Sequence, residues 1–116
     1  MQYMKLIRLT LGMAILAGFF SGCKEEIVRI PCDGSSPVWN GAVFEIVASS
    51  CLGSRCHSAG SPRGDYTEYS RILPTLLDNS FEIEVLETRR MPQDATLPDS
   101  ALAILQCWVE NGFPEN

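Results

Sequence analysis

The hydrophobic positions in the C-terminal two-thirds of the chain recur every three or four residues, which is the spacing of one face of an α-helix. Ser36 and Pro37 carry the signals of a helix start, because serine is a good N-cap and proline fits the first turn. We therefore expect a first helix that opens at Ser36 and runs toward Cys51. Its apolar face consists of Trp39, Val43, Ile46 and Val47.

Two shorter helices are expected in the middle of the chain. Thr67 is a candidate N-cap for a helix that Pro74 stops, and Ser80 is a candidate N-cap for the next one. The inward-facing positions of these two helices are Tyr69, Ile72 and Leu73 in the first and Phe81, Val85 and Leu86 in the second.

The strongest helical pattern spans residues 99–111, and Gly112 follows it as a terminator. Its apolar face is formed by Leu102, Leu105, Trp108 and Val109. Loops occupy residues 57–64 and 92–98, and no alternating strand pattern competes with the helices. The sequence therefore predicts an all-α fold of three to four short helices joined by long loops.

The first 22 residues have the organisation of a secretory signal peptide. Lys5 and Arg8 precede residues 9–20, which are apolar or small apart from one threonine. This run is shorter than the roughly 20 residues that a transmembrane helix needs. It leads into Phe20-Ser21-Gly22-Cys23, which resembles the lipobox of bacterial lipoproteins, in which the cysteine is acylated and becomes the first residue.

We therefore expect a lipoprotein signal peptide over residues 1–22, lipidation of Cys23, and an acylated tether over residues 23–35. An ordinary secretory signal with a chance cysteine is the alternative. Lys24-Glu25-Glu26 resembles a sorting tag by which some Gram-negative bacteria send lipoproteins to the outer surface. The expected location is the outer membrane, on its periplasmic or cell-surface face, with the acyl chains as the membrane anchor.

The charge of the chain argues against one class of partner. The sequence has 9 Lys and Arg against 14 Asp and Glu, a net charge of −5. Removing residues 1–22 takes away Lys5 and Arg8 and no acid, so the remaining chain carries −7. Nucleic acid is disfavoured as a partner at this charge, whereas a protein with a basic docking face is permitted.

Four cysteines remain when Cys23 is assigned to lipid: Cys32, Cys51, Cys56 and Cys107. A small exported domain has a thin core and commonly adds disulfides, a metal or a cofactor. In an oxidising compartment four cysteines allow three disulfide pairings, and the residues alone leave these open.

Cys56 is followed by His57, the only histidine in the chain. Cys-x-x-Cys-His is the attachment signature of haem c, in which two thiols bond the haem and the imidazole binds the iron. Here four residues separate Cys51 from Cys56. Gly53 and Ser54 lie among them and can loop out, so both sulfurs can reach one haem edge.

Met91 is the sole methionine outside the signal peptide. It lies between charged Arg90 and rigid Pro92 rather than in an apolar run, which favours a ligand-presenting loop over a core position. A thioether binds iron well and, opposite histidine, raises the reduction potential.

The order of these features resembles small monohaem cytochrome c domains of exported bacterial proteins. Those domains share a helix, a Cys…Cys-His, a Gly/Pro loop, a Tyr-bearing helix, a Met-Pro and a closing helix with Ile-x-x-Trp-Ile and Gly. The corresponding residues here are Ile46-Val47, Cys51, Cys56-His57, Tyr69, Met91-Pro92, Leu97, Leu102, Leu105-Gln106-Cys107-Trp108-Val109 and Gly112-Phe113. The resemblance covers nearly all of residues 32–116.

The resemblance implies a cytochrome c-like domain over residues 36–116, with its helices around one covalently bound haem c. Cys51 and Cys56 hold the haem in this interpretation, with His57 as the proximal and Met91 as the distal ligand of the iron. The implied function is single-electron transfer with redox partner proteins rather than enzymatic catalysis.

The resemblance also implies a disulfide between Cys32 and Cys107, because the first and last helices cross in this family's fold. The carbonyl of Pro62 is expected to accept the ring N–H of His57. Candidate hydrogen-bond donors to the haem propionates are Arg63, Tyr66, Tyr69 and Arg71. Trp108 is expected in the core.

Two other interpretations stay open at this point. In the first, the chain is a haem-free lipoprotein stapled by disulfides, with Cys51 bonded to Cys56, and it acts as a binding or structural module. In the second, Cys51, Cys56, His57 and Cys107 form a structural zinc centre.

Overall fold

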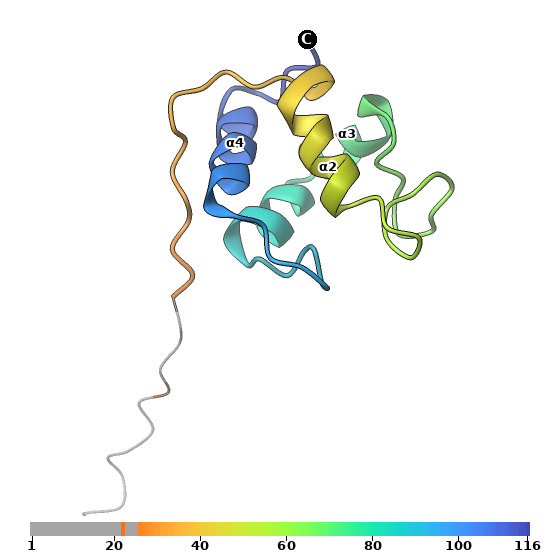
Figure 1. Cartoon of the computed structure of the whole chain (residues 1–116), viewed down its shortest axis with the longest axis horizontal. Helices are drawn as coiled ribbons and strands as arrows, with labels where there is room; N and C mark the ends of the chain where they lie inside the picture. Colours follow the sequence, from red (N-terminus) through yellow and green to blue (C-terminus); the bar gives the residue numbers. More distant parts are fainter. Residues whose placement is uncertain (1–21, 23–25) are drawn as a thin grey trace, which may run out of the picture.

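The computed structural model describes Gly22 and residues 26–116, so Cys23 and most of the expected signal peptide lie outside the described residues. Within this part the chain has helices and no strand, which confirms the all-α class that the sequence predicts (Figure 1). The elements are a wide π-type turn η1 (Trp39–Val43), α2 (Phe44–Ser50), α3 (Tyr69–Leu77), a second π-type element η2 (Glu82–Glu87) and α4 (Asp99–Glu110). None of these helices is long and apolar enough to cross a membrane.

The first helix begins at Trp39, so the expectation of a start at Ser36 is wrong. Val38 is still extended, and no side chain caps the helix. Instead, the N–H groups of Trp39 and Asn40 donate to the carbonyls of Pro114 and Glu115, at 2.9 and 3.0 Å. Backbone carbonyls from the other end of the chain thus satisfy donors that a Ser36 cap was expected to satisfy.

Helix α3 also differs from expectation at both ends. Thr67 is not its cap, because the Thr67 hydroxyl donates to the Asp65 carboxylate at 2.5 Å and the helix starts at Tyr69. Pro74 lies inside α3 rather than ending it. The helical bond that proline lacks would go to the carbonyl of Ser70, an exposed residue whose carbonyl water can reach.

Helical backbone resumes at Ser80 and continues through η2. Ser80 is not the cap; its N–H donates to the Asp78 carboxylate at 2.9 Å and its hydroxyl to the Thr75 carbonyl at 3.3 Å. The predicted inward face is confirmed, since the buried residues here are Phe81, Val85 and Leu86.

Helix α4 confirms the strongest sequence pattern. Gly112 has a φ of +77° and places the next residue so that Phe113 N–H reaches the Trp108 carbonyl at 2.7 Å, while Gly112 N–H reaches Val109 at 3.0 Å. These two bonds form a Schellman motif, the ending that a glycine at this position favours. The apolar face predicted for this helix is buried, except that Val109 is only half-buried.

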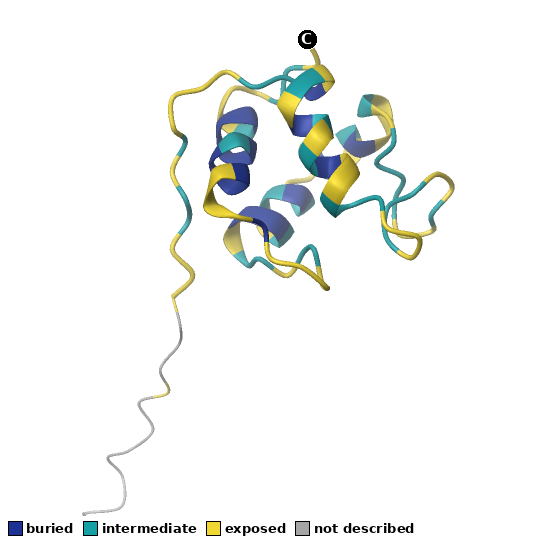
Figure 2. Cartoon of the chain, viewed as in Figure 1, coloured by how far each residue is buried: buried dark blue, intermediate teal, exposed yellow. Residues whose placement is uncertain are grey.

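The core forms around Trp108, which is fully buried. Buried residues recur along the helices on the sides where they face one another (Figure 2). Trp39 and Phe81 lie against Trp108, with ring centroids 5.9 and 6.0 Å away. The indole N–H of Trp108 donates to the Pro114 carbonyl at 3.0 Å, so its polar atom is satisfied. The start of the first helix, α4 and the C-terminal tail are therefore held together by one aromatic cluster, as expected for Trp108.

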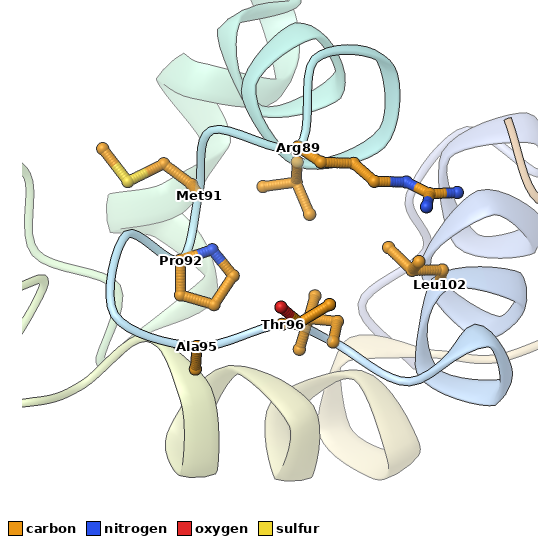
Figure 3. Close-up of a pocket in the computed structure, with 8 residues that line it drawn as sticks. Arg89, Met91, Pro92, Ala95, Thr96 and Leu102 are labelled. Atoms are coloured by element: carbon orange, nitrogen blue, oxygen red, sulfur yellow. The ribbon is translucent and has the colours of Figure 1, made fainter. Parts of the chain in front are cut away.

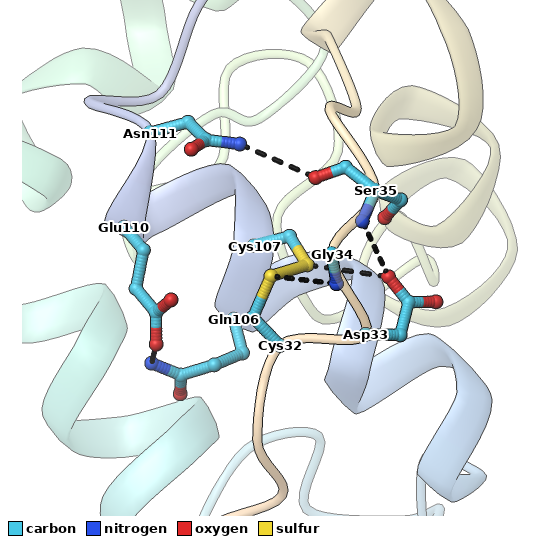
Figure 4. Close-up of a disulfide and its surroundings, with 8 residues drawn as sticks. All are labelled: Cys32, Asp33, Gly34, Ser35, Gln106, Cys107, Glu110 and Asn111. Carbon is cyan, nitrogen blue, oxygen red and sulfur yellow. Dashed lines mark hydrogen bonds between the residues drawn. A yellow bond between two sulfur atoms is a disulfide. The ribbon is translucent and has the colours of Figure 1, made fainter.

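Residues 26–38 form no helix and run past α4 (Figure 1). A disulfide joins Cys32 to Cys107 of α4, the pair that the family resemblance implies (Figure 4). Arg29 forms ion pairs with Glu82 and Glu87 of η2, at 2.9 and 2.6 Å. The C-terminal part of the expected tether is thus attached to the helical domain.

Candidate functional site

Cys51 directly follows α2, and its N–H still donates to the Val47 carbonyl at 2.8 Å. Val47 is completely buried, and this anchors the last turn of the helix in the core. Cys51 is half-buried and packs against that core. The buried face of the first helix therefore fixes where Cys51 lies at the end of α2.

The widened Cys-x4-Cys-His segment closes on itself through two backbone hydrogen bonds. Cys56 N–H donates to Gly53 at 2.8 Å, so residues 53–56 form a turn, and His57 N–H donates to the Cys51 carbonyl at 2.9 Å. In a Cys-x-x-Cys-His segment wound as one helical turn, the bond between residues four apart would join the same two groups. The two additional residues are thus absorbed in the turn.

Gly53 lies close to the second thiol. A Cβ added at this glycine would lie 3.3 Å from the sulfur of Cys56, a tight contact. Gly53, which the sequence analysis expects to let the segment loop out, therefore also leaves space for the Cys56 side chain.

The thiols of Cys51 and Cys56 are not bonded to each other. Burial, and to a smaller extent the neighbouring charge of Cys56, raises the pKa of the Cys51 thiol to about 11. Cys51 is therefore a protonated thiol at neutral pH in this conformation. The structure contains two adjacent free thiols, as haem attachment requires, and not the Cys51–Cys56 disulfide of the haem-free interpretation.

The imidazole of His57 is oriented by a backbone carbonyl. Its Nδ1 lies 3.1 Å from the oxygen of Gly64. A carbonyl oxygen only accepts hydrogen bonds, so Nδ1 is the donor of this bond, and in the neutral imidazole Nε2 then keeps its lone pair. This is the tautomer in which Nε2 can bind a metal.

The carbonyl that accepts this bond belongs to Gly64, so the expectation for Pro62 is wrong. Gly64 N–H closes a turn onto the Ser61 carbonyl at 3.2 Å, and its φ of +99° belongs to the left-handed region that favours glycine. A Cβ at Gly64 would lie 3.6 Å from Nδ1 of His57 and 3.3 Å from the Tyr66 ring. Both the backbone conformation and the space therefore call for glycine.

Tyr66 stacks on His57, a relationship that the sequence analysis missed. The two rings are parallel, with centroids 3.8 Å apart, and Tyr66 N–H donates to the His57 carbonyl at 2.9 Å. Burial raises the pKa of the Tyr66 phenol. The ring of Tyr66 therefore covers one face of the imidazole and restricts its rotation.

Asp65 holds the loop that carries these residues. Its carboxylate accepts hydrogen bonds from Thr67, through both hydroxyl and N–H, and from the N–H of Gly60, and it pairs with Arg71 at 2.8 Å. The hydrogen bonds from Thr67, then that from Gly60, and the charge of Arg71 lower the pKa of Asp65 to about 2. The signal in the sequence is an aspartate two residues before a threonine, the pattern of an Asx turn.

Three of the four candidate propionate donors already have partners in the described residues. Arg71 pairs with Asp65 and Glu68, the Tyr69 hydroxyl donates to the Phe113 carbonyl at 2.9 Å, and Arg63 donates to the Arg55 carbonyl. In this structure Arg71 therefore stabilises the loop that contains Asp65, and Tyr69 binds the C-terminal tail at Phe113.

Met91 belongs to a separate loop after η2. Its N–H donates to the Glu84 carbonyl at 3.0 Å, and its half-buried side chain packs against the core. The loop passes the C-terminal half of α2, the end from which Cys51 follows (Figures 1 and 3). Met91 borders a cavity of about 130 Å³, but its side chain points away from that cavity (Figure 3).

This cavity is not a haem site. It is smaller than the roughly 300 Å³ at which ligand pockets begin, and none of Cys51, Cys56 and His57 lines it. The structure thus brings Cys51, Cys56 and His57 together in one segment, while Met91 is presented separately near the end of α2.

The zinc interpretation is wrong in one of its ligands. Cys107 is bonded to Cys32 and has no thiolate to offer a metal. Among the described residues, Cys51, Cys56 and His57 also do not place three ligand atoms within 4.8 Å of one another, as one small ion requires.

The donor set fits haem c better than a single ion. Two free thiols can each bond a separate vinyl group at a haem edge, and His57 in its Nδ1–H form offers Nε2 to iron. Met91, on its separate loop, carries a thioether sulfur, which is the type of soft second ligand that such a site uses. Comparison of the chain with protein-family models, with curated proteins and with solved structures gave no match.

Proposed function

We propose that this chain is a membrane-anchored c-type cytochrome that carries single electrons, with a cytochrome c-like arrangement of its helices around one haem. The observation that carries the proposal is the hydrogen bond from Nδ1 of His57 to Gly64, next to two free thiols. In this arrangement the neutral imidazole offers Nε2 as a ligand in the same segment that carries the two free thiols.

Cys51 and Cys56 are the attachment residues in this proposal. Each thiol adds across one vinyl group of the haem, which forms a thioether and requires that the two sulfurs are not bonded to each other. The bond between His57 N–H and the Cys51 carbonyl keeps the first cysteine and the histidine in the relation that a shorter motif has.

His57 and Met91 are the proposed axial ligands. When bound, haem c would supply a one-electron couple, and if His57 and Met91 both held the iron, no position would be left open to a substrate. Gly64 and Tyr66 keep the imidazole in place, while the Met91 loop is bonded to η2 through Glu84. These residues favour electron transfer over bond-making chemistry.

The proposed partners are redox proteins with a basic docking face, since the chain without residues 1–22 carries a net charge of −7. The proposed anchor is an acylated Cys23 in the outer membrane. Arg29 is already held on η2, six residues after Cys23, and six extended residues span at most about 21 Å. The helical domain would thus lie close to the membrane surface.

The axial ligation can be tested on the full chain, exported by cells that attach haem c. We expect a low-spin visible spectrum that added imidazole or carbon monoxide leaves unchanged. Met91→Ala should keep the haem, bind both ligands and show a lower reduction potential, because the thioether is lost. Gln93→Ala, in the same exposed loop, is the matched control and should behave as wild type.

Two results would contradict the proposal. A wild-type chain that takes up no haem would reject the cytochrome, and two disulfides in that chain would support the haem-free stapled module. Equal ligand binding by wild type and Met91→Ala, both with haem attached, would reject Met91 as the second ligand.

A further inference from the structure

Four large hydrophobic side chains are exposed in the described part of the chain, and three of them belong to the tether and to η2. Ile27 and Val28 of the tether are 44% and 73% exposed, and Ile83 of η2 is 39% exposed. The fourth is Leu77, at the end of α3. Single exposed hydrophobic residues are ordinary, whereas several in one place mark a surface that an apolar partner can cover.

The tether is held on η2 at this place. Arg29 pairs with Glu82 at 2.9 Å, and Nη2 of Arg89 donates to the carbonyl of Val28 at 2.8 Å. Ile83 directly follows Glu82 in η2. These contacts use charged groups and the backbone of the tether, so they leave its apolar side chains uncovered. We call Ile27, Val28 and Ile83 the apolar patch.

The expected lipid anchor brings a bilayer within reach of the patch. Cys23 lies four residues before Ile27, and four extended residues span at most about 14 Å. Acyl chains on Cys23 would enter the hydrocarbon of the bilayer, above which the headgroup layer is roughly 5 to 7 Å thick. An anchored chain therefore carries Ile27 and Val28 in this layer or just above it.

The charges near the patch also suit a membrane surface better than those of the remaining domain. Residues 26–30 and 82–92 together carry three Arg and four Glu, which nearly cancel. The other residues from 31 to 116 carry three Arg against nine Asp and Glu. A membrane that contains anionic lipids repels this acidic remainder, so the nearly neutral part with the patch is the one that can approach it.

We propose that the apolar patch rests on the lipid bilayer and that its side chains enter the headgroup layer. This inference rests on the proposed anchor at Cys23, and it names the face of the domain that the anchor holds against the membrane. Each side chain of the patch gains free energy by leaving water. Because the anchor keeps the bilayer at high effective concentration, a small patch is sufficient.

The test uses the full chain, exported by bacterial cells and reconstituted in nanodiscs of phosphatidylethanolamine and phosphatidylglycerol. Methyl NMR signals are compared between nanodiscs with and without a lipid that carries gadolinium, and the mass of the same sample reports acylation of Cys23. We expect the gadolinium to reduce the signals of Ile27, Val28 and Ile83 and to spare that of Leu77. Ile83 is the decisive signal, because it belongs to η2 and not to the tether.

The double variant Ile27→Ser/Val28→Ser keeps the anchor and the ion pairs of Arg29. Neither side chain lies in the core, so the fold should be retained. The signal of Ile83 should then escape the effect of gadolinium. Leu77→Ser removes an exposed apolar side chain from α3 and is the matched control, in which Ile83 should respond as in the wild type.

An acylated wild-type chain whose Ile83 signal ignores the gadolinium would overturn the proposal and leave the anchor intact. An equal loss of the Ile83 signal in the double variant would also overturn it, because nearness to the anchor would then explain the effect. A chain without acyl groups whose signals all ignore the gadolinium would reject the anchor and the contact together.

Discussion

The ring nitrogen Nδ1 of His57 lies 3.1 Å from the carbonyl oxygen of Gly64. This contact determines which nitrogen of the only histidine carries the proton. The contact depends on the left-handed backbone of Gly64, on its turn onto Ser61 and on the hydrogen bonds of Asp65, which we call the clamp. The protonation of the imidazole is therefore linked to the stability of the loop over residues 57–67.

Replacement of Gly64 by alanine should destabilise the protein and disturb His57. The φ of +99° alone should cost about 1 kcal/mol, and the contact of the new Cβ with the Tyr66 ring about 1 kcal/mol more. Urea unfolding measures the total, and the ¹⁵N shift of the His57 ring reports the tautomer.

Gly60→Ala is the matched control for this variant. Gly60 also has a positive φ, of +74°, but an added Cβ meets nothing within 4 Å. It should cost only the backbone part and leave the His57 ring unchanged. Equal effects of the two substitutions would mean that the packing of Gly64 against His57 and Tyr66 has no energetic weight.

Asp65 should give the loop an acid-dependent stability. Its pKa is lowered from 3.8 to about 2, chiefly by the hydrogen bonds from Thr67 and then from Gly60, with a further contribution from Arg71. A lowered pKa in the folded state means that the contribution is complete above about pH 4 and is lost as pH falls through 2. Asp65→Asn should therefore lower the Tm at pH 7 and approach wild type near pH 2.

Thermal unfolding of wild type and Asp65→Asn across this pH range checks the prediction. Asp94→Asn, an exposed aspartate without a hydrogen bond among the described residues, provides the control and should show no such window. A constant difference in Tm between Asp65→Asn and wild type from pH 2 to pH 7 would be inconsistent with the clamp.

The Cys51 thiol should react slowly in the haem-free protein. Burial and the nearby Cys56 raise its pKa from 9.0 to about 11, so less thiolate is present at pH 8 than in an unfolded chain. By linkage, a raised pKa in the folded state stabilises the protein below pH 9, and this contribution is lost as pH rises toward 11. Alkylation followed by mass spectrometry measures the rate at Cys51 between pH 7 and 11.

Trypsin separates the two cysteines of the segment, because Arg55 lies between them. The urea-unfolded chain serves as the reference for intrinsic reactivity. If Cys51 reacts as fast in the folded chain as in urea at pH 8, its half-buried environment does not protect it.

The Cys32–Cys107 disulfide should contribute more to stability than the ion pairs beside it. It closes a loop with a sequence separation of 75, which the chain-entropy model values at about 4.5 kcal/mol, near the upper end of the roughly 0 to 5 kcal/mol that disulfides contribute. The pairs of Arg29 are partly exposed, and such pairs contribute roughly 0 to 1 kcal/mol. The double variant Cys32→Ala/Cys107→Ala should therefore unfold at a much lower urea midpoint than Arg29→Ala. A double variant as stable as wild type would contradict this ranking.

Local signals predicted the ends of helices only where local residues form the cap. Gly112 provides the left-handed position that ends α4, and this could be read from the sequence. Ser36 fails as a helix start because Pro114 and Glu115, which lie more than 70 residues away, satisfy the first N–H groups. A cap formed by distant backbone leaves no local pattern to read.

The sequence indicates the residue types of the candidate site, but it does not indicate what surrounds them. Cys51, Cys56 and His57 are adjacent in sequence, so their proximity required no tertiary information. The carbonyl of Gly64 and the ring of Tyr66 reach His57 only through the turn that follows it, and Pro62 was the wrong acceptor for that reason. The position of Met91 relative to His57 depends on how two loops pack, which no pattern in the sequence encodes.

The most direct test of the central claim is the mass of the peptides that carry Cys51 and Cys56. The full chain, exported by cells that attach haem c, is treated with a thiol reductant and digested with trypsin. Cleavage after Arg55 separates residues 30–55 from residues 56–63. Reduction releases any disulfide, whereas thioether bonds to haem survive it.

We expect the two peptides to remain joined, with the added mass of one haem. A chain with Gly53 and Ser54 deleted has the usual Cys-x-x-Cys-His spacing and serves as the control for maturation in the same cells. Two separate haem-free peptides from the wild-type chain, beside a haem-bearing deletion variant, would contradict the claim that Cys51, Cys56 and His57 form a haem c attachment site.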